Sequence, residues 1–369
     1  SLFSWQLLRN WDIRSGSEGQ LTLERRTYLV STLLVFVFAV QALSLLLFIF
    51  NAEKMSPLFV GAMCAVGTLN VNSYGMPTLL IKVVVFFLAA IWLVLNHLDT
   101  RGYDYPLTRH KYRLLLAITP FVALEAYLQL QYFLGLDADV ITSCCGSLFG
   151  GDRETLATEL AGLSPLPAML GFYTTMGVTI ASALWYRHRH KGGYLFAGMS
   201  ALGFAVSIVA IISFLSLYIY EHPHHHCPFC VLQGEYHFQG YLLYIPLFAA
   251  TALGLGVGII QPFQQVPSLR EAAPAMARRL GRAHGAFVAV CAAGPAGTAP
   301  CRSQRCPQAF HLQGLPAASH RPADRSAGAI LLEDRVPGAE LPRQCGRRGP
   351  RGKQAGGVLG AACGPNCIM

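Results

Sequence analysis

Long apolar runs separated by short polar segments dominate the first 264 residues of the chain. A helix needs about 20 apolar residues to cross the hydrocarbon core of a bilayer, and six runs reach that length. Stretches such as 45–50 are continuously apolar, unlike the alternating strands of a membrane barrel. The pattern predicts six transmembrane helices, over Tyr28–Phe50, Thr78–Leu98, Leu114–Leu136, Leu166–Tyr186, Tyr194–Tyr220 and Tyr241–Ile260.

The chain outside these runs divides into two further segments. Residues 1–27 form an amphipathic N-terminal segment, and residues 265–369 are rich in Ala, Gly, Pro and Arg without a sustained apolar period. Such a composition predicts a disordered basic tail; read-through or out-of-frame translation of GC-rich DNA is an alternative origin for it. We therefore expect an all-α, polytopic bundle over residues 28–264, and we expect no site at the tail cysteines.

Composition agrees with a membrane protein. The chain is 53% hydrophobic and only 13% charged, whereas soluble proteins carry about 25% charged residues. The net charge of +9 comes entirely from residues 265–369, which hold 14 Lys and Arg against 5 Asp and Glu, while residues 1–264 hold 14 of each. We expect the lipid bilayer, and no nucleic acid, as a partner.

The distribution of positive charge predicts the orientation. Lys and Arg cluster before the first run and after the second, fourth and sixth runs, whereas the other three connections hold only Lys54 and Arg153. Because cytoplasmic loops carry the excess of Lys and Arg, both termini should be cytoplasmic, with connections 51–77, 137–165 and 221–240 outside. In a bacterium, this predicts an inner-membrane protein with periplasmic loops.

All the cysteines of the membrane part fall in or beside these outer connections: Cys64, Cys144, Cys145, Cys227 and Cys230. The Cys-Pro-Phe-Cys spacing of residues 227–230 is typical of dithiol redox centres. It predicts a membrane thiol–disulfide oxidoreductase in which Cys227 exchanges and Cys230 resolves. The adjacent cysteines Cys144 and Cys145, with Cys64 as a further member, would relay electrons to a periplasmic thiol-redox protein or a quinone.

Two other functions fit the same residues. Cysteine and histidine together bind soft metal ions such as zinc or copper(I), so a metal site in a permease or sensor is one alternative. Its ligands would be His224, His225, His226, Cys227, Cys230 and His237. The other alternative is structural, because disulfides between outer loops would stabilise a membrane protein that has no chemistry of its own.

Two ionisable residues fall inside the apolar runs. Intramembrane charges are expensive and mark functional sites or pairs. Lys82 lies about one turn inside the second run, so its side chain can reach the membrane surface. Glu125 lies near the middle of the third run and requires a partner, for which Lys82 or a water or proton path are the candidates.

Three motifs carry a resemblance to known proteins: 61–64 (Gly-Ala-Met-Cys), 142–146 (Thr-Ser-Cys-Cys-Gly) and 226–230 (His-Cys-Pro-Phe-Cys). Through them, residues 1 to about 264 resemble multi-pass bacterial inner-membrane proteins that have no established activity. The motifs also resemble those of quinone-coupled disulfide-forming enzymes, including the vitamin K epoxide reductase family. That resemblance implies electron transfer to a membrane quinone, although those enzymes have four core helices.

Overall fold

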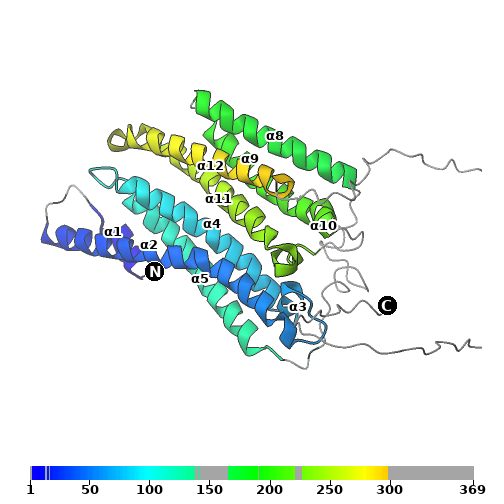
Figure 1. The fold of residues 1–369 in the computed structure, drawn as a ribbon. Helices are drawn as coiled ribbons and strands as arrows, with labels where there is room; N and C mark the ends of the chain where they lie inside the picture. The colour runs from blue at the N-terminus through cyan, green and yellow to red at the C-terminus, as the bar shows by residue number, and fades with distance from the viewer. Residues whose placement is uncertain are drawn as a thin grey trace, which may run out of the picture. The chain divides into compact units, whose positions relative to one another are not determined.

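The computed structural model describes residues 2–12, 15, 17–137, 140, 165–189, 191–220 and 227–297. The chain divides into two units, residues 1–302 and 303–369, and the second unit lies outside the described residues. The described part of the first unit is helical and contains no strand. Six of its helices are long and apolar enough to cross a membrane (Figure 1). The predicted fold class is confirmed.

Each of these six helices covers one of the predicted apolar runs. They are α2 (Glu18–Met55), α4 (Gly75–Asp99), α5 (Thr108–Leu134), α8 (Pro165–Arg189), α9 (Gly193–Ala210) and α11 (Gln239–Ile260). Helix α9 continues through a π-helical turn, Ile211–Leu215, into α10 (Ser216–Tyr220). The other α-helices of the described residues are α1 (Leu2–Asn10), α3 (Ala65–Leu69) and α12 (Ala272–Gly297).

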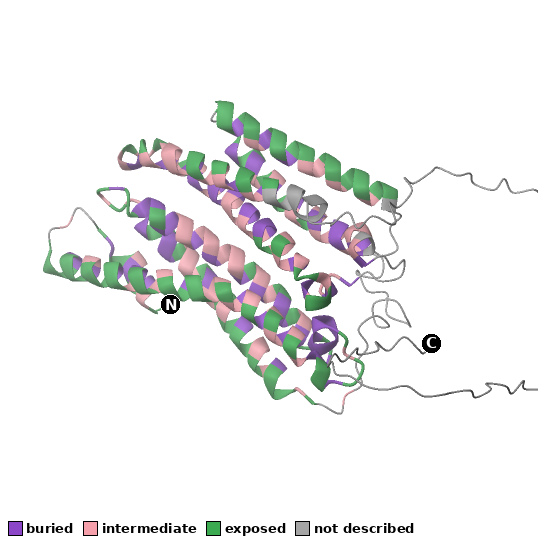
Figure 2. Cartoon of the chain, viewed as in Figure 1, coloured by how far each residue is buried: buried purple, intermediate pink, exposed green. Residues whose placement is uncertain are grey.

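Helix α2 illustrates how the sequence forms these spans. Ser17 caps its start, because the Ser17 hydroxyl accepts a hydrogen bond from the backbone N–H of Gln20 at 3.3 Å, which satisfies one of the free amides of the first turn. Leu29, Leu33 and Phe36 lie three and four residues apart and are 54–66% exposed. Figure 2 shows that exposed residues also predominate on α8. Apolar surface of this extent is typical of helices that face lipid.

The helices pack in two groups that meet at α4 and α11. Helix α4 packs against α2 and α5, whereas α11 packs against α9, α12 and α4. Close approach of α9 and α11 depends on glycine, because a Cβ at Gly258 would lie 2.4 Å from the Ala197 Cβ and one at Gly254 would lie 2.2 Å from the Ser200 Oγ. Glycine at these two positions therefore allows α9 and α11 to pack closely.

Lys82 and Glu125 form a buried ion pair between α4 and α5. The Lys82 Nζ lies 2.6 Å from a Glu125 carboxylate oxygen and donates to the Ser44 hydroxyl at 2.8 Å. Gln41 of α2 donates to both carboxylate oxygens. Lys82 is only 2% exposed, so it does not extend to the membrane surface; the pairing expected for Glu125 is the arrangement found.

A second buried ion pair closes the other end of the α4–α5 hairpin. The Lys111 Nζ lies 2.8 Å from the Asp99 carboxylate and donates to the Asn96 side chain at 3.1 Å. Asp99 also accepts hydrogen bonds from the Leu107 backbone N–H and the Thr108 hydroxyl. Helix α4 thus supplies the lysine of one pair and the carboxylate of the other.

Helix α12 changes the boundary predicted for the tail. The sequence pattern ends the membrane domain at residue 264, but α12 packs against α11 and α8. Its packed side presents Ala273, Ala277 and His284, all at most 3% exposed, and the His284 Nδ1 lies 2.8 Å from the Ala250 carbonyl oxygen. The small side chains at 273 and 277 allow close helix approach, so the packed bundle continues beyond residue 264, at least to Val288.

Candidate soft-metal centre

Two connections meet at one end of the bundle, which we call the cysteine end. The first runs from α2 to α4 and carries Cys64, which immediately precedes the short helix α3. The second leads into α11 and carries Cys227 and Cys230, the latter at the start of a 3₁₀ turn, Cys230–Leu232. His237 and Phe238 both adopt a left-handed conformation, with φ of 55°, and reverse the chain before α11 begins.

The sulfur atoms of Cys64, Cys227 and Cys230 converge, and we call these residues the cysteine triad. All three Sγ atoms lie within 4.8 Å of one another, and those of Cys64 and Cys227 are 3.5 Å apart. No disulfide joins the three. Their side chains are 0%, 2% and 4% exposed, respectively. A protein partner would therefore reach the sulfurs only after the surrounding side chains move aside.

The surroundings of the triad are apolar and aromatic. Val66, Tyr220, Val231 and Leu232 form the buried part of its wall, and Met76 from the first turn of α4 packs against the same cluster. Tyr220 donates a hydrogen bond to the Cys227 carbonyl oxygen at 2.6 Å. Tyr244 of α11 donates to the Pro228 carbonyl oxygen at 2.8 Å. These two hydroxyls anchor the Cys-Pro-Phe-Cys turn to its flanking helices.

Glu53 and Gln233 fasten the two connections together. The Glu53 carboxylate, in the last turn of α2, accepts hydrogen bonds from the Ala65 backbone N–H at 2.8 Å and from the Gln233 side-chain amide at 2.7 Å. The same amide donates to the Met63 carbonyl oxygen at 2.8 Å. Both sequence neighbours of Cys64 are thus bonded to this pair, which we call the Glu53–Gln233 latch.

Contacts among the thiols make them unequal. Hydrogen bonds from the Cys230 and Cys64 thiols, followed by backbone N–H groups of Phe229 and Cys230, hold the pKa of Cys227 well below its usual range, although burial opposes this shift. The pKa of Cys230 is raised, because its thiol donates to the Cys227 sulfur and is itself buried. Of the two thiols, Cys227 is therefore the one that ionises more readily.

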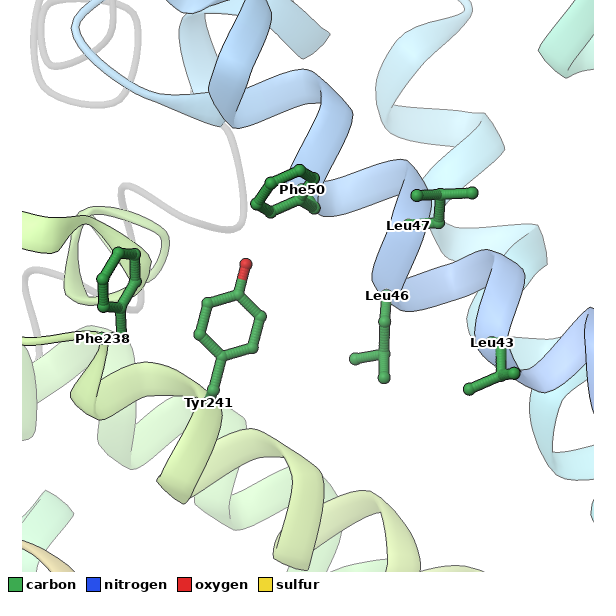
Figure 3. A pocket seen from close by; sticks show the side chains of 6 residues that line it. All are labelled: Leu43, Leu46, Leu47, Phe50, Phe238 and Tyr241. Atoms are coloured by element: carbon green, nitrogen blue, oxygen red, sulfur yellow. The ribbon is translucent and has the colours of Figure 1, made fainter.

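An apolar groove of about 460 Å³ lies between α2 and α11 near the triad. Figure 3 shows the Tyr241 hydroxyl pointing toward Phe50 across this groove. The groove is lined by Leu43, Leu46, Leu47, Phe50, Phe238 and Tyr241. Ile49, beside the groove on α2, and Tyr241 also pack against the triad cluster, so groove and triad share part of one wall.

The triad unites only some of the residues predicted from sequence. Cys64 joins Cys227 and Cys230, whereas Cys144 and Cys145 lie outside the described residues, as do His224, His225 and His226. His237 is described, is exposed and does not belong to the group. Lys82 and Glu125 bond to each other and to α2 instead.

Four residues that support the triad were not foreseen: Glu53, Gln233, Tyr220 and Tyr244. A signal existed for the first of them, since Glu53 and Lys54 are the only charged residues between Tyr28 and Thr78. The tyrosines resemble ordinary membrane-interface anchors, and their hydrogen bonds to the cysteine turn cannot be read from spacing.

Comparison with known proteins finds no matching protein family, no similar curated protein and no similar solved structure.

Proposed function

We propose that the protein is a multi-pass membrane protein that binds a soft metal ion through the cysteine triad, on the outer face of a bacterial inner membrane. The observation that carries this proposal is the convergence of three sulfurs from two distant connections. Around one ion, with metal–sulfur bonds of about 2.3 Å, neighbouring sulfurs lie about 4 Å apart. The triad sulfurs, all within 4.8 Å and 3.5 Å apart at the closest, fit this arrangement with small side-chain adjustments.

Burial supports a metal ion over free thiolates. A negatively charged sulfur without a counter-charge is unfavourable in an apolar wall such as this one. A bound cation supplies that charge, and metal binding releases the thiol protons. The three thiols could therefore all act as ligands when the ion is present.

Metal analysis of the purified full-length chain under reducing conditions tests this proposal. We expect about one equivalent of zinc or copper, and a loss of metal in each of Cys64→Ser, Cys227→Ser and Cys230→Ser. Cys345→Ser, which changes a cysteine far along the C-terminal segment, is the matched control and should retain the metal. Unchanged metal content in all three triad variants would refute the proposal.

Thiol–disulfide exchange is the second candidate, because Cys227 contacts both other thiols. The Cys227 thiolate would attack the disulfide of a thiol-redox partner, form a mixed disulfide and release one partner thiolate. The Cys230 thiolate would then attack Cys227, form the 227–230 disulfide and release the second partner thiolate. In the reverse direction, a partner dithiol would reduce the 227–230 disulfide and become a disulfide itself. A quinone in the apolar groove would then take up two electrons and two protons from the reduced Cys227–Cys230 pair.

A trapping experiment separates the two candidates. Under the redox mechanism, Cys230→Ser should accumulate a mixed disulfide through Cys227, whereas Cys227→Ser should accumulate none. Under the metal mechanism, both substitutions should lower bound metal equally and neither should trap a partner. Non-reducing electrophoresis with mass spectrometry distinguishes these outcomes.

A further inference from the structure

Among the described residues, the possible metal ligands that converge at the triad are all cysteines. The triad supplies three thiols, and the thioether-bearing side chain of Met76 packs against the same cluster. Thiolate and thioether together are soft ligands, and such sets favour copper(I), whereas zinc sites are built from cysteine, histidine and carboxylate without thioether. A methionine in the wall therefore points toward the softer ion.

A second thioether is exposed to solvent next to Cys64 in the chain. Met63 directly precedes Cys64 in the chain, and its side chain is 74% exposed. Its carbonyl oxygen accepts a hydrogen bond from the Glu53–Gln233 latch, so the backbone at this position is fixed. Met63 and Cys64 are thus consecutive sulfur-bearing residues, one exposed and one buried.

The burial of the triad sulfurs also helps to distinguish between zinc and copper(I). Zinc held by three protein ligands keeps water in its fourth position, and a site of that kind needs an opening to solvent. The triad sulfurs are at most 4% exposed and are enclosed by apolar and aromatic side chains. Copper(I) accepts coordination by sulfur alone, and exclusion of water protects it from oxidation.

From these observations we infer that the triad is a cuprous-ion site, with Met63 as the first sulfur contact and Met76 as a supporting one. This inference rests on the proposed metal function and specifies its ion. It treats the three cysteines as the ligands and the two methionines as the residues that discriminate copper(I) from zinc.

Competition titrations on the reduced full-length chain in nanodiscs test the inference. Copper(I) is titrated against bathocuproine disulfonate, and zinc against pyridylazoresorcinol. We expect one copper(I) to be retained against the competitor, and Met76→Leu to weaken copper(I) binding by about 10-fold, the size typical of supporting residues around a metal site. Zinc binding should not change in that variant, because zinc gains little from a thioether.

Further variants complete the design. Met63→Leu should slow copper(I) uptake from a chelator without changing the final occupancy. Met169→Leu, on helix α8 and outside the cluster around the triad, is the control. Tighter binding of zinc than of copper(I), or loss of binding on joint replacement of His224, His225 and His226 by Ala, would overturn the cuprous assignment and leave a metal centre. Binding of neither ion would refute the metal function itself.

Discussion

At the scale of single residues, Glu53 determines where Cys64 lies. Its carboxylate bonds to the amide directly after Cys64 and to Gln233 on the opposite connection. Glu53→Ala leaves both donors without this acceptor, and an unsatisfied donor of this kind costs about 1–3 kcal/mol when it is buried. We expect faster alkylation of Cys64 and weaker metal binding, measured by mass spectrometry and chelator competition.

Lys54→Ala provides the matched control for Glu53→Ala. Lys54 is the adjacent residue, is exposed and does not belong to the latch, so its removal should leave the protection of Cys64 unchanged. Equal protection of Cys64 in wild type and Glu53→Ala would show that the latch does not position the triad.

The Lys82–Glu125 pair supports a second prediction at this scale. Removing one partner of a buried ion pair leaves an uncompensated charge, which typically costs about 3–5 kcal/mol. Glu125→Leu should therefore destabilise the chain strongly in detergent unfolding, whereas the double variant Lys82→Met with Glu125→Leu should recover most of the loss. A single variant as stable as wild type would mean that the Lys82 charge finds another partner.

The chemical character of these residues can be predicted from the sequence, whereas their contacts in the fold cannot. Cysteines in outer connections are visible as such, and so is a charge inside an apolar run. The proximity of Cys64 to Cys227, which are 163 positions apart, depends on how α2, α4 and α11 pack. Glu53, at the end of an apolar run, reads as a boundary residue, because nothing local shows that Gln233 will lie beside it.

At the scale of elements, α12 supports a test by truncation. A chain ending at Gln265 lacks the helix that covers α11, and it exposes surfaces such as Gly256, whose Cβ position lies 3.1 Å from Leu280. A chain ending at Gly297 keeps that helix. We expect the shorter chain to lose thermal stability in detergent and the longer one to match the full-length protein. Equal stability of both truncations would show that α12 is dispensable.

The elements themselves were largely predictable because each transmembrane span needs a long apolar run and little else. Helix α12 was missed because Ala, Gly and Arg dominate it, a composition shared with disordered tails. The packed residues of α12 are spaced four, three and four positions apart, at 273, 277, 280 and 284. Because several of them are small, they differ too little in hydrophobicity from the exposed residues for the helical period to be recognised in the sequence. The π-helical turn after α9 has no sequence signal at all.

At the scale of the whole molecule, the orientation remains a prediction from charge. Reporter fusions after Gly102 and Lys191 should be cytoplasmic, and fusions after Asn72 and Gly234 should be periplasmic, because Lys and Arg cluster in the former connections. Alkaline phosphatase activity and fluorescence of a cytoplasmic reporter measure the two sides. A cytoplasmic result at Gly234 would place the triad in a reducing compartment.

The wide separation of the triad along the chain has a consequence for assembly. Cys64 follows the first span and Cys227 precedes the last, so an ion bound to both closes a ring through α4, α5, α8 and α9. During synthesis this ring cannot close until the ribosome has passed Cys230. An ion that binds only the closed form stabilises it by about 4 kcal/mol when present at a thousand times its dissociation constant. Two fragments cut between α8 and α9 would thus share one ion, and a chelator would weaken their association.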